Sequence, residues 1–259
     1  LENSLDIDGI LKLAATAPDL KDETEPAGID PAFGFHLEEP VRIAVAEDEA
    51  FCFFYADNFR LLKKMGAELV PFSPIRDEEL PENIQGLLLY GGYPELNGQK
   101  LEENISMKTS IKEAVEGGMP CLAECGGFMY LHDTMEDMDG VERHTAGVIP
   151  GRSYRTPRLN RFGYITLAQK KPVLGEADLG SIPGHEFHYF DSENCGGDFI
   201  AHKPESKRSW ECIHGTDTML VGYPHLYYYG CPKLPKAFLK KCLDYKKQRC
   251  SGQKEHQEA

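Results

Sequence analysis

The chain has 259 residues, and its 28 lysines and arginines against 42 aspartates and glutamates give a formal net charge of −14. This acidic balance argues against a protein that binds nucleic acid or an anionic membrane, because both of these ligands attract a basic surface. With 41% hydrophobic residues and no apolar run near the roughly 18 residues of a membrane-spanning helix, the composition predicts a globular protein with a large core.

Residues 1–40 are expected to lie outside the main domain. Leu5–Ala17 has a short helical apolar pattern, and the polar, proline-containing stretch Lys21–Pro40 is typical of a linker. The sequence also begins with Leu1 instead of methionine. We therefore interpret residues 1–40 as the remnant of an upstream domain followed by a linker.

From Val41 onward, strand and helix patterns alternate along the chain. Asp57 and Asn104 are typical helix caps, and Gly66 is a typical helix end. Strands are expected at residues 41–46, 68–72, 84–90 and 119–123, and helices at residues 57–66, 104–118 and 128–135. This alternation predicts an α/β fold with a mostly parallel central sheet and helices on both of its faces.

The second half of the chain is richer in strands. Strands are expected at residues 164–167, 184–190, 210–214 and 219–229, and a closing helix at residues 235–246. The remaining residues, 247–259, are polar and are expected to form a C-terminal tail. The main domain is therefore predicted to span residues 41–246.

Cys125 is the candidate nucleophile. The buried strand that ends at Glu124 runs into Cys125-Gly126-Gly127 and then into a helix, which is the layout of a nucleophile elbow. The two glycines allow neighbouring backbone to come close, and a helix N-terminus favours a thiolate and directs N–H groups to an oxyanion. Cys121 lies inside the apolar strand and is expected to be an ordinary buried thiol.

The other cysteines predict neither a metal site nor a disulfide framework. None of the eight cysteines forms a C-x-x-C pair, so zinc ribbons and fingers are not expected. We expect reduced thiols in a cytoplasmic protein, because nothing at the N-terminus has the layout of a signal peptide.

A glycine pair is expected beside this cysteine. Gly91 and Gly92 follow the predicted strand 84–90, so their loop opens at the carboxyl edge of the parallel sheet, where ligands of such sheets bind. Paired glycines let backbone N–H groups approach a carbonyl oxygen. A plain tight turn is the alternative interpretation.

A thiolate that makes and breaks an acyl bond needs a base, which is usually histidine. His225 follows the apolar strand near the end of the fold, and His185 lies on the predicted strand 184–190. Spacing alone does not separate these two candidates. His188, three residues after His185, lies on the opposite face of a strand, so the two are poor joint metal ligands.

Six stretches resemble a known family. They are 44–51 (AVAEDEAF), 91–96 (GGYPEL), 123–131 (AECGGFMYL), 156–159 (TPRL), 184–189 (GHEFHY) and 222–226 (GYPHL). The chain resembles the glutamine amidotransferase domain of cobyrinic acid a,c-diamide synthases, of the cobyric-acid-synthase type within the class I amidotransferases. The stretches run in family order between residues 41 and 246, and they imply a flavodoxin-like class I amidotransferase domain.

The resemblance implies roles for several residues. Cys125 corresponds to the nucleophile that attacks the side-chain amide of L-glutamine, and His225 corresponds to its base. Gly92 and Gly126 match the positions whose N–H groups form the oxyanion hole, with Gly91 beside them. His185 and Glu186 are expected near the site without a chemical step.

Two positions depart from the pattern of the wider class. Many class I amidotransferases place a glutamate two residues after the histidine, and Tyr227 stands there in this chain. The wider class also places a glutamine, which helps to hold the substrate, four residues after the cysteine. Met129 stands at that position in this chain. We therefore expect a Cys–His dyad oriented by another group.

The resemblance also implies a partner. In the family, ammonia passes to an ATP-dependent synthetase domain that amidates the a and c acetate groups of cobyrinic acid for cobalamin biosynthesis, so the chain is a component of a carbon–nitrogen ligase. No G-x-x-x-x-G-K-[ST] motif occurs here, so we expect no cofactor in this domain, and ATP and Mg²⁺ in the missing N-terminal synthetase domain or subunit. The corrinoid acceptor is expected to bind mainly to that partner.

Three other functions remain open. The same glutaminase could serve a nickel-sirohydrochlorin a,c-diamide synthase, because the acceptor does not bind mainly to this domain. A non-catalytic binding module is disfavoured by the presence of Cys125, His225 and both glycine pairs. A cysteine peptidase on a flavodoxin-like sheet is disfavoured by residues 156–159 and by the late histidine.

Overall fold

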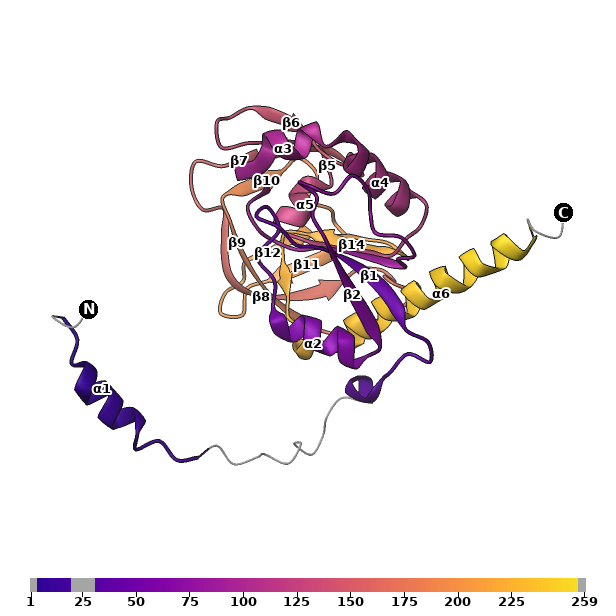
Figure 1. Cartoon of the computed structure of the whole chain (residues 1–259). Helices are drawn as coiled ribbons and strands as arrows, with labels where there is room; N and C mark the ends of the chain where they lie inside the picture. Colours follow the sequence, from indigo (N-terminus) through magenta and orange to yellow (C-terminus); the bar gives the residue numbers. More distant parts are fainter. Residues whose placement is uncertain (1–3, 20–30, 256–259) are drawn as a thin grey trace. The chain divides into compact units, whose positions relative to one another are not determined.

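The computed structural model describes residues 4–19 and 31–255, and the chain divides into two units, Leu1–Pro31 and Ala32–Ala259 (Figure 1). In the first unit, α1 (Ile7–Ala14) begins after Asp6, whose side chain accepts a hydrogen bond from the N–H of Gly9. Much of the expected linker and the last four residues of the expected tail lie outside the described residues. No helix in the described ranges is long and apolar enough to cross a membrane.

The second unit is built on a six-stranded sheet with the order β13-β14-β4-β3-β1-β2. These strands are β1 (Val41–Ala46), β2 (Ala67–Phe72), β3 (Gly86–Leu89), β4 (Cys121–Glu124), β13 (His214–Gly215) and β14 (Met219–Gly222). All neighbours in this sheet pair in parallel except β13 and β14. The predicted mostly parallel central sheet is therefore confirmed.

Helices cover both faces of this sheet (Figure 1). The helices are α2 (Ala56–Lys64), α3 (Gly98–Glu103), α4 (Ile105–Glu116), α5 (Gly126–Tyr130) and α6 (Lys233–Glu255), and the 3₁₀ turns are η1 (Pro31–Gly34), η2 (Pro94–Asn97) and η3 (Tyr228–Gly230). Because side chains alternate along a strand, Ile43 of β1 packs with α2 and α6, whereas its neighbour Ala44 packs with α4 and α5. The sheet thus separates two hydrophobic cores.

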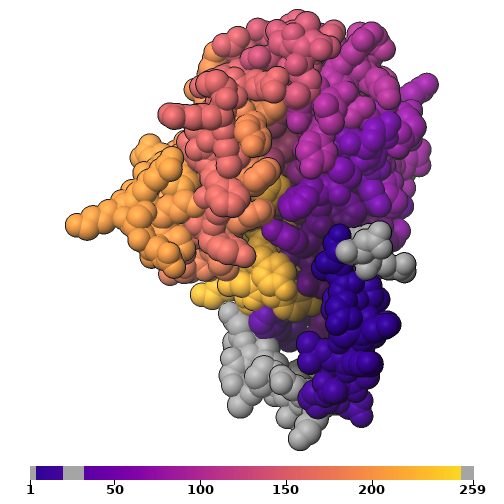
Figure 2. Space-filling view, turned by 90° about the vertical axis from the view of Figure 1, so that its left-hand side faces the viewer, coloured from indigo at the N-terminus to yellow at the C-terminus, as the bar shows by residue number. Residues whose placement is uncertain are grey.

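Two further sheets make up the strand-rich second half. One has the order β10-β7-β5-β6, from β5 (His132–Glu136), β6 (Glu142–His144), β7 (Ile149–Arg155) and β10 (Phe190–Ser192). The other has the order β12-β11-β8-β9-β15, from β8 (Arg161–Gln169), β9 (Ile182–His188), β11 (Phe199–His202), β12 (Ser209–Cys212) and β15 (His225–Leu226). In the space-filling view, this salmon-to-orange half lies beside the purple surface of the first half (Figure 2).

Three expected elements differ from those in the structure. The helix expected at 128–135 ends at Tyr130, because the chain enters β5 and pairs there with β7. The single strand expected at 210–214 is two strands in different sheets, separated by Ile213, whose φ is 64°. The strand expected at 219–229 also divides, because the chain leaves the central sheet after Gly222 and enters the five-stranded sheet at His225.

The boundaries of the main unit are wider than expected. Leu37 is buried, and its N–H donates to the carbonyl oxygen of Met65, so residues within the expected linker pack onto the domain. At the other end, α6 continues through residues 247–255 of the expected tail. The identification of the first 40 residues with an upstream domain stays a prediction.

Candidate active site

Cys125 lies in the sharp turn between β4 and α5. Its φ and ψ are 47° and −107°, a conformation that L-residues rarely adopt and that costs on the order of 1–3 kcal/mol. Two backbone hydrogen bonds hold the turn, from the N–H of Cys125 to the carbonyl of Gly222 (2.9 Å) and from the N–H of Met129 to the carbonyl of Cys125 (2.9 Å). This is the geometry of a nucleophile elbow at the carboxyl edge of the central sheet.

The glycines beside Cys125 are required by close backbone contacts. A Cβ at Gly127 would lie 2.0 Å from the carbonyl oxygen of Leu89. A Cβ at Gly126 would lie 2.8 Å from Cδ of Pro94 and 3.1 Å from the backbone nitrogen of Gly92. The glycine loop after β3 and the first turn of α5 therefore meet next to the cysteine, as the sequence predicts.

His225, in the five-stranded sheet, lies at the same carboxyl edge as Cys125. It begins β15, is 4% exposed, and lies within hydrogen-bonding reach of Cys125. The backbone of Gly91 packs against its ring, since a Cβ there would lie 2.6 Å from Cε1 of His225. Phe53 covers another side of the ring, with centroids 4.8 Å apart. The structure thus brings together Cys125, His225, Gly91, Gly92 and Gly126.

Glu124 is the residue that sequence reasoning missed. Its Oε2 lies 3.5 Å from Nδ1 of His225, and both side chains are 5% exposed. The backbone N–H of Leu226 donates a second hydrogen bond to this carboxylate. The available signal was a charged residue at the end of the buried strand 121–124, directly before the cysteine, because a buried carboxylate needs a partner.

The protonation of His225 is set by its neighbours. Burial by itself lowers the pKa of His225, but the Cys125 thiol and the Glu124 carboxylate outweigh burial and raise this pKa to about 10. Burial raises the pKa of the Glu124 carboxyl, although the hydrogen bond and charge of His225 oppose this change. Burial thus disfavours either charge alone, and the partner's charge favours it; burial prevails at Glu124, whereas the neighbours prevail at His225.

The two expected near-site residues on β9 point in different directions. His185 pairs with His225 in the sheet, their ring centroids are 5.0 Å apart, and the hydroxyl of Tyr55 lies 3.3 Å from Nδ1 of His185. Burial and the charge of His225 lower the pKa of His185. Glu186 is fully buried on the other side of β9, where Arg161 and His188 each lie 3.8 Å from its carboxylate. Only His185 therefore contacts the candidate site.

Tyr227 and Met129 stand where the wider class has a glutamate and a glutamine. Tyr227 is 40% exposed, and its hydroxyl donates to Asp57 (3.4 Å), so it cannot replace a carboxylate beside His225. Met129 is buried in the core on the side of α4 and α5. Neither side chain supplies the polar group that the wider class places there.

Asn58 of α2 fastens the segment that carries His225. Its side-chain amide donates to the carbonyl of Leu226 (2.8 Å) and accepts from the N–H of Tyr228 (2.9 Å). We expect Asn58→Ala to lower the free energy of unfolding by about 2–4 kcal/mol, because two buried backbone groups lose their partners. Urea denaturation measures this loss. Asn97→Ala is the control, since the side chain of Asn97, at the N-cap of α3, makes no capping hydrogen bond, and an equal loss in both variants would contradict the assignment.

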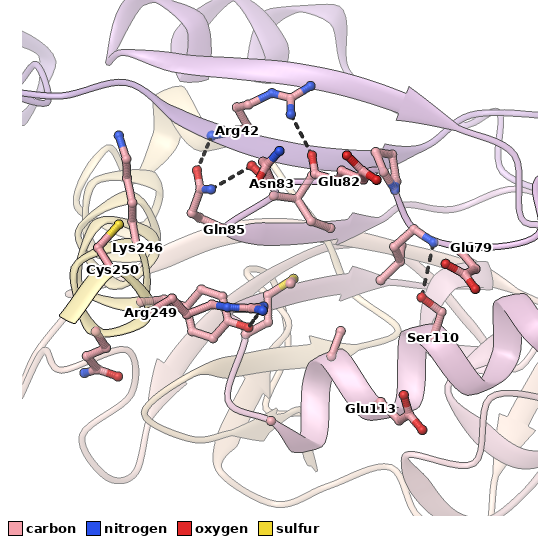
Figure 3. A pocket seen from close by; sticks show the side chains of 18 of the residues that line it. Arg42, Glu79, Glu82, Asn83, Gln85, Ser110, Glu113, Lys246, Arg249 and Cys250 are labelled. Carbon is pink, nitrogen blue, oxygen red and sulfur yellow. Dashed lines mark hydrogen bonds between the residues drawn. The ribbon is translucent and has the colours of Figure 1, made fainter. Parts of the chain in front are cut away.

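A large cavity of about 1160 Å³ lies at the opposite, amino edge of the central sheet (Figure 3). Several residues that line it are hydrogen-bonded to one another. Gln85 accepts from the N–H of Arg42 and donates to the carbonyl of Asn83, and Arg42 donates to the carbonyl of Glu82. It contains neither a nucleophile–base pair nor one of the predicted site residues. We therefore place the candidate active site at the carboxyl edge, around Cys125.

Comparison with known proteins gives a consistent result. Residues 42–222 match the model of the CobB/CobQ-like glutamine amidotransferase domain. The cobyrinate a,c-diamide synthase of Caldanaerobacter subterraneus subsp. tengcongensis is 37% identical over 251 residues, covering 95% of this chain and 53% of that protein. The enzyme of the same name from Dehalococcoides mccartyi is 36% identical over 246 residues, covering 93% of this chain and 52% of that protein. The chain thus spans about half the length of these relatives.

A solved structure agrees at the level of the fold. A crystal structure of a glutamine amidotransferase aligns with a TM-score of 0.53 at 18% identity, covering 77% of this chain and 98% of that one. This similarity supports the flavodoxin-like, mostly parallel α/β architecture of the second unit.

Proposed function

The chain belongs to the CobB/CobQ-like glutamine amidotransferase family, and we propose that it is the glutaminase part of a cobyrinate a,c-diamide synthase. The observation that carries the proposal is the meeting of Cys125, on a strained strand-to-helix turn, with a buried histidine and a glycine loop. Such an arrangement suits acyl transfer through a thioester. The names of the two relatives described above suggest the acceptor.

The positions of these groups support the following mechanism. His225 takes the thiol proton of Cys125, and the thiolate adds to the side-chain carboxamide carbon of glutamine. The oxyanion accepts hydrogen bonds from the N–H groups of Gly92 and Gly126, which are fixed beside the cysteine. The tetrahedral adduct then loses ammonia, to which the His225 imidazolium gives its proton, and a glutamyl thioester remains. Water, activated by His225, hydrolyses the thioester to glutamate and restores the thiol.

The ATP-dependent step is assigned to a separate synthetase part. Among the described residues, no group of three or more His, Cys, Asp or Glu side chains is arranged to hold a metal ion. In this proposal the partner would hold ATP, Mg²⁺ and the corrinoid, and ATP would supply the phosphoryl group that leaves as phosphate when ammonia released at Cys125 forms the amide.

Glutamine turnover tests the proposal. We expect this chain to convert glutamine to glutamate and ammonia in equal amounts, and to do so faster when the synthetase half of the Caldanaerobacter relative is added with ATP, Mg²⁺ and cobyrinic acid. Nickel sirohydrochlorin in place of cobyrinic acid is the control acceptor. Faster turnover only with the nickel compound would overturn the assigned acceptor, and no glutamate under any of these conditions would overturn the glutaminase function.

A further inference from the structure

We propose that Glu124 is the positioning residue of His225 and completes a Glu–His–Cys triad in which the carboxylate directly precedes the nucleophile. The inference rests on the proposed glutaminase function. In the wider class, a glutamate two residues after the histidine orients the histidine, but this chain has Tyr227 at that position. The proposal gives the orienting role to Glu124 instead.

The first observation is the contact between the Glu124 carboxylate and the His225 imidazole. Oε2 of Glu124 lies 3.5 Å from Nδ1 of His225. Among the described residues, neither Nδ1 of His225 nor Oε1 of Glu124 has a hydrogen-bond partner, and Oε2 of Glu124 is the carboxylate atom in ion-pair contact with Nδ1. A buried Nδ1 without a partner beside a buried carboxylate is expected to bond to that carboxylate, because leaving either group unpaired is costly.

The other charged and titratable groups near the pair do not replace Glu124. His185 faces His225 from β9, but its ring nitrogen Nδ1 faces the hydroxyl of Tyr55. Tyr90 and Tyr228 lie near Glu124, and their hydroxyls bond to each other at 3.0 Å. These groups are neutral at physiological pH. Glu124 is therefore the one carboxylate among the described residues in ion-pair contact with His225.

The backbone makes Glu124 a rigid support. Glu124 pairs with Gly222 across β4 and β14, and the next residue, Cys125, donates its N–H to the carbonyl of Gly222. The N–H of Leu226, beside His225, donates to the Glu124 carboxylate. These hydrogen bonds hold the Glu124 carboxylate beside both the Cys125 turn and the His225 segment.

This position gives Glu124 a specific chemical effect. By accepting the Nδ1–H of His225, it fixes the tautomer whose Nε2 is free to take the thiol proton of Cys125. It also stabilises the imidazolium that forms when that proton arrives. Because the pair is excluded from water, this stabilisation is larger than that of a surface ion pair.

The first test measures the protonation of His225 by NMR and requires no turnover. In a Cys125→Ala background the thiol no longer contributes, so any pKa of His225 that stays above the ordinary value of about 6.5 reports Glu124. We expect the added change Glu124→Gln to lower this pKa below about 6.5, because burial then acts alone. Glu186→Gln, which removes an equally buried carboxylate on the other side of β9, is expected to leave it unchanged. An unchanged His225 pKa after Glu124→Gln would overturn the proposal.

The second test is glutamine hydrolysis in the chain that retains Cys125. We expect Glu124→Gln to lower kcat by about 100-fold or more, with little change in KM, because the amide no longer supports the imidazolium. Glu124→Asp is expected to recover part of the rate and the high pKa of His225, which a purely structural role would not predict. If no variant or parent turns over glutamine, the proposed function fails while the NMR result still decides the role of Glu124.

Discussion

Replacing Cys125 by alanine is expected to abolish glutamine hydrolysis, with a loss of about 10⁴-fold or more. The reason is that no other thiol can take its place in the turn between β4 and α5. Glutamate release, followed by a coupled enzymatic assay, measures the loss. The variant is expected to keep its fold, because alanine is smaller than cysteine and leaves the hydrogen bonds of the turn intact.

Cys121 provides the matched control. It lies four residues earlier, at the start of β4, it is fully buried, and burial raises its pKa to about 12. A thiol in that environment stays protonated near neutral pH. Cys121→Ala is therefore expected to keep most of the hydrolytic activity. Glutamine turnover that survives Cys125→Ala would refute the thioester mechanism.

The largest expected effect on stability comes from Gly127→Ala. The added Cβ would lie 2.0 Å from the carbonyl oxygen of Leu89 and 2.4 Å from its carbonyl carbon. Both atoms are backbone of the central strand β3, so they cannot move without disturbing the sheet. We expect the free energy of unfolding to fall by about 3 kcal/mol or more, as in an overpacked core. Chemical denaturation measures this change.

Gly34→Ala is the comparison for this variant. Gly34 ends η1, and a Cβ there would have no atom within 4 Å. Its substitution is expected to be neutral or slightly stabilising, because alanine reduces the conformational entropy of the unfolded chain. If Gly127→Ala and Gly34→Ala unfold at the same denaturant concentration, the close packing of α5 on β3 is wrong.

Much of the architecture could be predicted from the sequence because its signals are local. The apolar strands before Glu47, Gly91 and Cys125 each end at the carboxyl edge of one parallel sheet. This rule alone brings the glycine loop and the cysteine turn together. The elbow was recognisable for the same reason, because a strand, a cysteine, two glycines and a helix follow each other directly.

The remaining features depend on contacts between distant segments. The apolar run 219–229 has the pattern of one strand, yet it crosses between two sheets at Tyr223 and Pro224. His225 could therefore not be distinguished from His185 by spacing, since the two face each other in adjacent strands. Glu124 was missed because its partner lies about 100 residues away in the chain, and no local pattern reports such a contact.

The division of the site between two sheets has a consequence for how the protein loses activity. The nucleophile belongs to the central sheet and the base to the five-stranded sheet, so no single sheet contains both. A displacement of 1 Å between reacting groups can cost about 100-fold in rate. A small shift of the five-stranded sheet relative to the central sheet would therefore abolish activity, even if the hydrogen bonds within each sheet stayed intact. The rate of glutamine hydrolysis therefore reports how precisely the central sheet and the five-stranded sheet are packed against each other.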